Sequence, residues 1–205
     1  MNGQKKSNTN STNKFVIPII ILIMVIAFLV KNEGFTTRLL KSKTNNKKYE
    51  IQEYNHKDQD VANLMGTINI FIDNFSTYLI NKYPNDERIQ RLIKNLKNTE
   101  YKESVFEPGT SSYTINKGEE ISVCLRQKNQ NKTIHDLNTL KFVIIHELGH
   151  VITISEGHTD EWYDNFKFLL REARKAGLYN PVNYSKKNIN YCGVDVTHNP
   201  YYNSI

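Results

Sequence analysis

The sequence predicts a compact α+β domain, in which helices pack around a small antiparallel sheet, with one apolar segment placed before the domain. Apolar residues recur at helical spacing in several stretches after residue 59. Two short β-type runs flank a turn near Gly118. The apolar segment is the uncharged run at residues 15–30. A chain of 205 residues is long enough for one such domain and a tail.

Charge is divided unevenly along the chain. Residues 1–60 carry ten Lys/Arg and five Asp/Glu, whereas residues 61–205 carry seventeen and sixteen. The net charge of +6 therefore belongs mostly to the first sixty residues, and the predicted domain is close to neutral. A nucleic-acid-binding surface needs a clustered basic face. We therefore expect no direct binding of nucleic acid.

The uncharged run at residues 15–30 follows a polar N-terminal tail, residues 1–14. As a helix it would span about 24 Å, somewhat less than a hydrocarbon core of about 30 Å. Lys14 and Lys31 can extend from its two ends to the headgroups. A cleaved signal peptide is the alternative, but no small-x-small cleavage site follows Ala27. The run predicts a transmembrane anchor and a single-pass membrane protein.

Basic residues are more frequent after this run than before it. Counted by the positive-inside rule, they favour the cytoplasmic side for the C-terminal domain. Residues 31–58 are basic, rich in Asn and without sustained periodicity, which predicts a flexible linker. The predicted domain then covers residues 59–205.

The domain should begin with two helices and a hairpin. The first helix starts near Gln59 and is broken by Pro84, and Asp86 can cap the second. The β-type runs at residues 112–115 and 121–126 should pair through the turn between them. The two cysteines, Cys124 and Cys192, show no metal-binding spacing. We expect two small buried hydrophobes, with a single disulfide as the alternative.

Two more helices are expected in the second half. Asp136 or Asn138 can cap a helix that runs to about Ile152, and Thr159 can cap the next helix, which Gly177 ends. An extended tail with one short strand should complete the domain.

The motif His146-Glu147-Leu148-Gly149-His150 lies on the first of these helices. Residues four apart on a helix lie side by side, so the two imidazoles can hold one zinc ion. Glu147 can then take a proton from the water that the zinc activates. The motif predicts a zinc-dependent hydrolase with one Zn²⁺ per chain. The rival interpretation is a pair of core histidines held by hydrogen bonds.

A catalytic zinc site needs a third protein ligand and one open position. His158 follows His150 after seven residues, and Gly157 can turn the chain back toward the metal. The acidic alternatives are Asp160, Glu161 and Glu172. The basic neighbours of Glu172 suggest a solvated helix end, so His158 is the preferred third ligand.

These residues resemble a known family. The HELGH motif, followed after a short turn by His158-Thr159-Asp160-Glu161-Trp162, is similar to the signature of WLM and SprT-like zinc metallopeptidases. Over roughly residues 60–200, the chain resembles membrane-anchored WLM-like peptidases of large DNA viruses. The resemblance implies a zincin-like fold, with His146, His150 and His158 as zinc ligands and Glu147 as general base. If the chain is viral, its membrane is that of the host or the virion.

The predicted function is therefore a membrane-anchored zinc metallopeptidase that cleaves a protein or peptide substrate. Tyr113, Tyr163 and Arg126 are candidates for the group that stabilises the oxyanion. The alternative function is a non-catalytic membrane or virion protein whose metal site only stabilises the fold. Glu147 favours the enzyme, because a structural site has no use for a carboxylate beside an open metal position.

Overall fold

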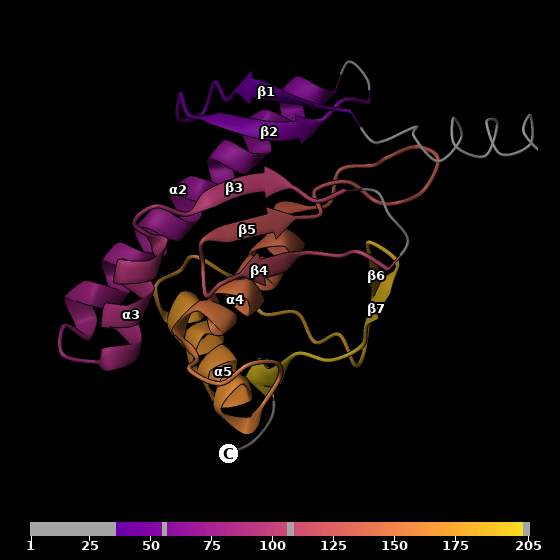
Figure 1. Ribbon diagram of the computed structural model, residues 1–205. Helices are drawn as coiled ribbons and strands as arrows, with labels where there is room; N and C mark the ends of the chain where they lie inside the picture. The colour runs from indigo at the N-terminus through magenta and orange to yellow at the C-terminus, as the bar shows by residue number, and fades with distance from the viewer. Residues whose placement is uncertain (1–35, 55–56, 106–108, 203–205) are drawn as a thin grey trace, which may run out of the picture. The chain divides into compact units, whose positions relative to one another are not determined.

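A computed structural model describes residues 36–54, 57–105 and 109–202 (Figure 1). Its helices are α2 (Asp58–Lys82), α3 (Glu87–Leu96), α4 (Leu137–Ile152) and α5 (Asp160–Lys175), with a short 3-10 helix η1 (Pro200–Tyr202). Its strands are β1 (Thr37–Lys41), β2 (Lys48–Gln52), β3 (Glu100–Glu103), β4 (Tyr113–Ile115), β5 (Glu120–Val123), β6 (Ile189–Tyr191) and β7 (Val194–Val196).

The main sheet contains five strands in the order β1-β2-β3-β5-β4. The outer pairs, β1 with β2 and β4 with β5, are antiparallel, whereas β3 is parallel to both β2 and β5. Parallel neighbours need a crossover connection, and α2 with α3 supplies the one from β2 to β3. The expected small antiparallel sheet is therefore wrong, and the fold is mixed α/β. The predicted hairpin of β4 and β5 is confirmed.

The prediction of a flexible linker is wrong for the residues that form β1 and β2. Residues 37–52 form an antiparallel hairpin, with Thr37 paired to Gln52 and Lys41 to Lys48. In this hairpin Tyr49 and Ile51 are buried in the core, and the partly buried Leu40 packs against it. The other positions are mostly polar or charged, so the alternating pattern is too short to be seen in the sequence. The hairpin is nevertheless part of the domain, which extends to residues before 59.

The predicted membrane helix, residues 15–30, lies outside the described residues. Within residues 36–54, 57–105 and 109–202, no helix is both long and apolar enough to cross a bilayer. The predicted fold class included a transmembrane helix, and the chain was predicted to be a single-pass membrane protein. Both predictions are corrected, because the described part of the chain contains no such helix. The membrane assignment rested on local features of residues 15–30, namely the uncharged run, its length as a helix and the flanking lysines.

Helix α4 lies at the centre of the domain. It contacts α2, α3 and α5 as well as strand β4, and α2 runs along the sheet (Figure 1). The predicted caps are confirmed: Asp86 accepts a hydrogen bond from Arg88 N at 2.9 Å, and Asp136 accepts one from Thr139 N at 2.9 Å. Because its apolar residues are buried on nearly every side, α4 is held rigidly, which suits a helix that carries a motif.

A buried ion network joins the sheet to α2. Arg126 is fully buried and donates two hydrogen bonds to Glu103, of 2.8 and 2.7 Å, and one of 2.7 Å to Asp58. Arg38 on β1 also donates to Asp58, at 2.9 Å. Arg126 further reaches the carbonyl of Gln52. Arg126 is therefore a structural residue, and its proposed role as an oxyanion donor is wrong.

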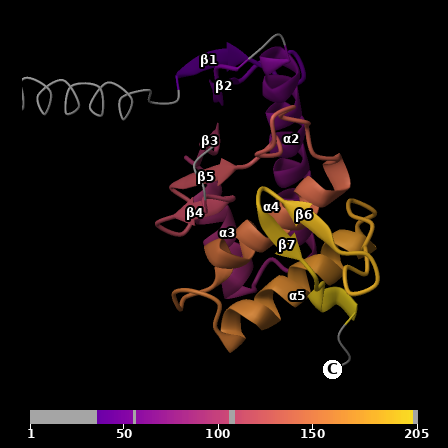
Figure 2. The same cartoon turned by 90° about the vertical axis from the view of Figure 1, so that its right-hand side faces the viewer.

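The last segment of the chain forms a separate two-stranded sheet, β6 and β7 (Figure 2), and β7 lines a recess together with α4. A disulfide between Cys192, in the turn of this hairpin, and Cys124, directly after β5, fixes it to the main sheet. The preferred expectation of two unpaired cysteines is therefore wrong, because residues 68 apart in sequence are brought together by the fold.

Candidate metal and catalytic site

Helix α4 presents His146 and His150 one turn apart, with their ring centroids 5.2 Å apart. Both side chains are only partly buried, in contrast to the apolar residues on the other faces of the helix. Between them Gly149 faces α5, where a Cβ would lie 3.1 Å from Trp162 Nε1. The glycine of the motif therefore allows α5 to pack closely against the histidine face of α4.

His158 reaches the same place from the loop after α4. Gly157 has φ +77°, a conformation that favours glycine, and it turns the chain toward α5 as predicted. The loop is held by Glu161, whose carboxylate accepts hydrogen bonds from Ile154 N at 2.9 Å and Ser155 N at 3.0 Å. These bonds fix His158 in position over α4.

The three histidines form one cluster. Nε2 of His158 lies 3.1 Å from Nε2 of His146, and the His150 and His158 ring centroids are 4.9 Å apart. One ligand nitrogen from each ring lies within 4.8 Å of the others. Two nitrogens on one tetrahedral zinc are about 3.3 Å apart, given a Zn–N distance of about 2.0 Å. The cluster therefore fits a zinc ion with little rearrangement.

The surroundings disfavour the protonated forms of His146 and His150. Burial, together with the neighbouring imidazoles, lowers the pKa of His146 to about 3. Burial and the nearby His158 lower the pKa of His150 to about 4. Trp162 packs against all three rings, with centroid distances of 4.6, 5.2 and 4.3 Å to His146, His150 and His158. Neutral imidazole is the form that binds a metal ion.

Glu147 lies next to the cluster and is almost completely buried. Its Oε2 accepts a hydrogen bond of 2.8 Å from the hydroxyl of Thr114 on β4. Burial raises the pKa of Glu147 to about 7, although the Thr114 hydrogen bond opposes this shift. A carboxylate with such a pKa is a stronger base than an exposed one near neutral pH.

A cleft of about 480 Å³ opens over these groups. It is lined by the three histidines and Glu147, by β4 and by Val194 of β7. A smaller recess of about 130 Å³ extends from it and is lined mainly by apolar side chains of α4 and β7. Strand β4 is at the edge of the main sheet, so one side of it has no strand partner in that sheet. The site is thus an open cleft next to a free sheet edge.

Comparison with known proteins identifies the family. The model of the WLM domain matches residues 86–200, more than half of the chain. Over 189 residues the chain is 32% identical to an uncharacterized protein of Acanthamoeba polyphaga mimivirus, covering 87% of this chain and 93% of that protein. The chain belongs to the WLM domain family. The expected resemblance to WLM-like proteins of large DNA viruses is confirmed.

Other relatives of this WLM domain match shorter parts. An uncharacterized protein of Invertebrate iridescent virus 6 is 38% identical over 88 residues, which are 42% of this chain and 48% of that protein. Among solved structures, a mutant of Wss1 from Saccharomyces cerevisiae superposes with a TM-score of 0.46 at 18% identity, over 62% of this chain and 90% of that chain.

The acidic alternatives for the third ligand lie outside the histidine cluster of this WLM domain. The carboxylate of Glu161 accepts hydrogen bonds from Ile154 and Ser155 in the loop after α4, and these bonds lower its pKa to about 2. Glu172 binds Lys82 at 2.7 Å and Lys175 at 2.6 Å, between α5 and α2. Of the acidic candidates, none belongs to the cluster of possible ligands in the described part of the chain.

Sequence reasoning missed Thr114, the hydrogen-bond partner of Glu147. A threonine in a strand is ordinary, and no local pattern marks the one that faces the motif. Of the remaining oxyanion candidates, Tyr113 lines the cleft, whereas the hydroxyl of Tyr163 lies 3.3 Å from Nε2 of His198. Tyr113 is thus the candidate that the fold brings to the site.

The buried ion pairs of Glu172 should contribute to the stability of the fold, and this contribution can be tested independently of the histidine cluster. Burial alone would raise the pKa of this glutamate, but hydrogen bonds from Lys175, Lys82 and Tyr78 lower it to about 2. A carboxyl group has a pKa of about 4.3 in the unfolded chain. Its contribution to stability is therefore complete above about pH 4.3 and is lost as the pH falls toward 2. We expect Glu172→Gln to reduce the free energy of unfolding by about 2 kcal/mol at pH 7.

Urea denaturation at pH 7, 5 and 3 measures this difference. The gap between Glu172→Gln and the parent should narrow at pH 3, because Glu172 takes up a proton there in the unfolded parent chain, whereas in the folded chain its pKa of about 2 keeps it largely ionised. Glu53→Gln is the matched control, since Glu53 is exposed. A gap that is constant from pH 7 to pH 3 would contradict the lowered pKa.

Proposed function

We propose that this WLM domain protein is a zinc-dependent metallopeptidase that hydrolyses peptide bonds. The observation that carries the proposal is the cluster of three histidines with the buried Glu147 beside it, at the floor of an open cleft. Membership of the WLM domain family supports the same assignment. In this proposal His146, His150 and His158 are the metal ligands.

The residues of the chain have separate tasks in this reaction. Zinc bound by the three imidazoles would supply a Lewis acid and make a water molecule more acidic. Glu147 accepts a proton from the attacking water and can pass it to the leaving amine. Thr114 holds one oxygen of this carboxylate, so that the other is free to face the cleft. Burial of Glu147 favours the proton transfer near neutral pH.

The substrate class follows from the shape of the site. An extended peptide can add to the free edge of β4 through backbone hydrogen bonds. The recess below the cleft would then receive an apolar side chain from a residue next to the cleaved bond, because Phe142, Val143 and Val196 line it. We propose protein or peptide substrates, and no direct recognition of nucleic acid.

The rival function, a metal site that only stabilises the fold, fits the geometry less well. A structural zinc site is usually closed by a fourth protein ligand. In the described part of the chain, the cluster at this site contains three His, Cys, Asp or Glu side chains that could ligate a metal. The cleft leaves the fourth side accessible. An accessible position beside a carboxylate is the arrangement that catalysis needs.

Zinc content and peptide hydrolysis of the full chain test the proposal. We expect about one tightly bound zinc at the histidine cluster, and hydrolysis of an unfolded protein substrate that a chelator abolishes and zinc restores. His158→Ala should weaken zinc binding at this cluster by about 100-fold or more, because one of three ligands is lost.

His198→Ala is the matched control, since His198 is exposed and lies outside the cluster. Its zinc affinity and activity should equal those of the parent chain. Zinc affinity that is unchanged in His158→Ala would remove His158 from the ligand set. Zinc binding without hydrolysis of any protein or peptide substrate would favour the structural rival.

A further inference from the structure

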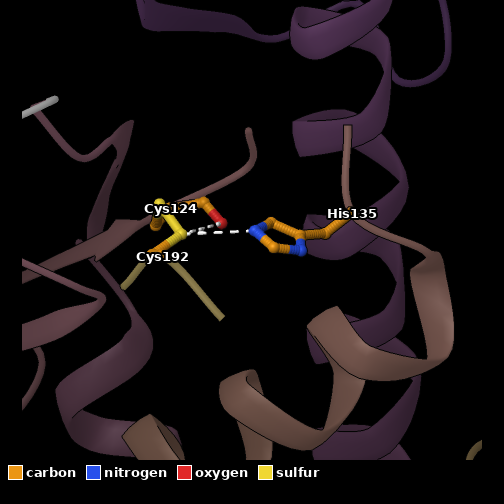
Figure 3. Close-up of side chains that lie close together, drawn as sticks. All are labelled: Cys124, His135 and Cys192. Carbon is orange, nitrogen blue, oxygen red and sulfur yellow. Dashed lines mark hydrogen bonds between the residues drawn. A yellow bond between two sulfur atoms is a disulfide. The ribbon is translucent and has the colours of Figure 1, made fainter. Parts of the chain in front are cut away.

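A second group of metal-ligating side chains lies outside the catalytic cleft. Cys124 follows β5, His135 precedes the cap of α4, and Cys192 is in the turn between β6 and β7. All three are buried, and one ligand atom of each lies within 4.8 Å of the others. Figure 3 shows the imidazole pointing at the two sulfur atoms, which form a disulfide. We call these three residues the cysteine–histidine cluster.

The orientation of His135 is not explained by the disulfide. Nε2 lies 3.3 Å from Sγ of Cys192, yet a sulfur atom is only a weak hydrogen-bond acceptor. The ring is buried and packs on Tyr191 with a centroid distance of 4.7 Å. A buried imidazole that faces two sulfur atoms has the composition of a site for a thiophilic metal ion.

The distances agree with this composition. With Zn–S of about 2.3 Å and Zn–N of about 2.0 Å, sulfur and nitrogen on one tetrahedral zinc are about 3.5 Å apart. The observed distance from His135 Nε2 to Cys192 Sγ is 3.3 Å. The carbonyl oxygen of Arg126 lies 3.2 Å from Cys124 Sγ and 3.7 Å from Cys192 Sγ, where it can serve as the fourth ligand.

The sulfur atoms must move apart by about 1.8 Å to share one cation, because a disulfide holds them about 2.0 Å apart. Two thiolates on one zinc are about 3.8 Å apart, given the same Zn–S distance. The Cα atoms of Cys124 and Cys192 are 6.5 Å apart, near the upper end of the range of about 4.4–6.8 Å found for disulfides. Once the bond between the sulfur atoms is broken, rotation of the two side chains can supply the difference.

We propose that the reduced form of the cysteine–histidine cluster is a second metal site, in which Cys124, Cys192 and His135 bind a thiophilic divalent cation such as Zn²⁺. A phosphine reductant and one water convert the disulfide to two thiols, and the phosphine becomes its oxide. The cation then displaces the two thiol protons to the solvent. In a reducing compartment the two cysteines exist as thiols, so the cation replaces the disulfide there.

The cysteine–histidine cluster lies next to one wall of the recess beside Glu147. Tyr191, next to Cys192, donates a hydrogen bond of 2.9 Å to the carbonyl of Cys124, and its hydroxyl also lies 2.6 Å from Ser112 Oγ. The hairpin that carries Tyr191 forms one wall of the recess beside Glu147. Either a disulfide or a bound metal would keep this wall in place under the redox conditions that favour it.

Cobalt binding to the full chain tests the proposal. Co²⁺ bound by thiolates gives a charge-transfer band in the near ultraviolet, which a site made only of histidines does not give. The band therefore reports on the cysteine–histidine cluster whether or not the histidine cluster binds metal. We expect the band, and one additional cobalt per chain, in phosphine-reduced protein with two titratable thiols, and neither in the oxidised protein.

Variants assign the ligands. Cys192→Ser should abolish the band, and His135→Ala should weaken cobalt binding at this site by about tenfold or more, because one ligand is lost. His198→Ala should leave the band and its affinity unchanged. A reduced protein with native circular dichroism, two free thiols and no band would overturn the proposal. So would unchanged affinity in His135→Ala, or a loss of native structure on reduction that cobalt does not restore.

Discussion

Replacing Glu147 by Gln should lower peptide hydrolysis by a factor of about 10²–10⁴ while zinc remains bound at the histidine cluster. Gln has nearly the same shape and can still accept the hydrogen bond of 2.8 Å from Thr114, so the local structure should be kept. It cannot accept a proton from the attacking water. The rate of hydrolysis of an unfolded protein substrate and the zinc content of the same sample are measured together.

Glu87→Gln is the control for this experiment, because Glu87 is exposed on α3, far from the motif in the chain. It should retain full activity. If Glu147→Gln loses activity and zinc together, the loss of metal explains the result and the role of the general base is not supported. If it keeps activity within tenfold of the parent, another group accepts the proton and the proposed mechanism is wrong.

Replacing Arg126 by Met should reduce the free energy of unfolding by about 3–5 kcal/mol. Met fills a similar volume but leaves the buried carboxylates of Glu103 and Asp58 without their main cationic partner. Arg38 compensates only partly, since it contacts Asp58 and is itself partly exposed. Urea denaturation of the full chain, followed by circular dichroism, measures the change.

Two further variants separate the charge effect from packing. Arg126→Met combined with Glu103→Met should recover part of the loss, because the most deeply buried unpaired charge is then removed. Arg174→Met, at an exposed position of α5, should change stability by less than about 0.5 kcal/mol. If Arg126→Met is as stable as the parent, the network contributes little, and the assembly of the sheet does not depend on it.

Local signals predicted much of the helical structure and the motif. Helical spacing, the caps Asp86, Asp136 and Thr159, and the break at Pro84 act within a few residues, so each is visible in the sequence. The strands were less predictable. Strand β3, Glu100–Glu103, is four residues long and mostly polar, so no apolar pattern marks it in the sequence. It is nevertheless the middle strand of the main sheet, because it pairs with β2 on one side and β5 on the other.

Long-range contacts account for the errors. The sequence suggested Arg126 as a candidate oxyanion donor, yet its side chain is buried with Asp58 and Glu103, which are 68 and 23 residues away. It also suggested two unpaired cysteines, whereas the fold closes a disulfide over 68 residues. Such pairings depend on which elements become neighbours, and no local pattern contains that information.

The sequence by itself determined the motif His146–His150, the turn at Gly157 and the helices that carry them, because these depend on residues a few positions apart. Only the tertiary structure decided that β4 brings Thr114 to Glu147, that β1 and β2 belong to the sheet, and that the hairpin of β6 and β7 forms a wall of the cleft. The physical reason is that packing and pairing join segments that are distant in the chain. Burial then sets the charge state of the groups that they enclose.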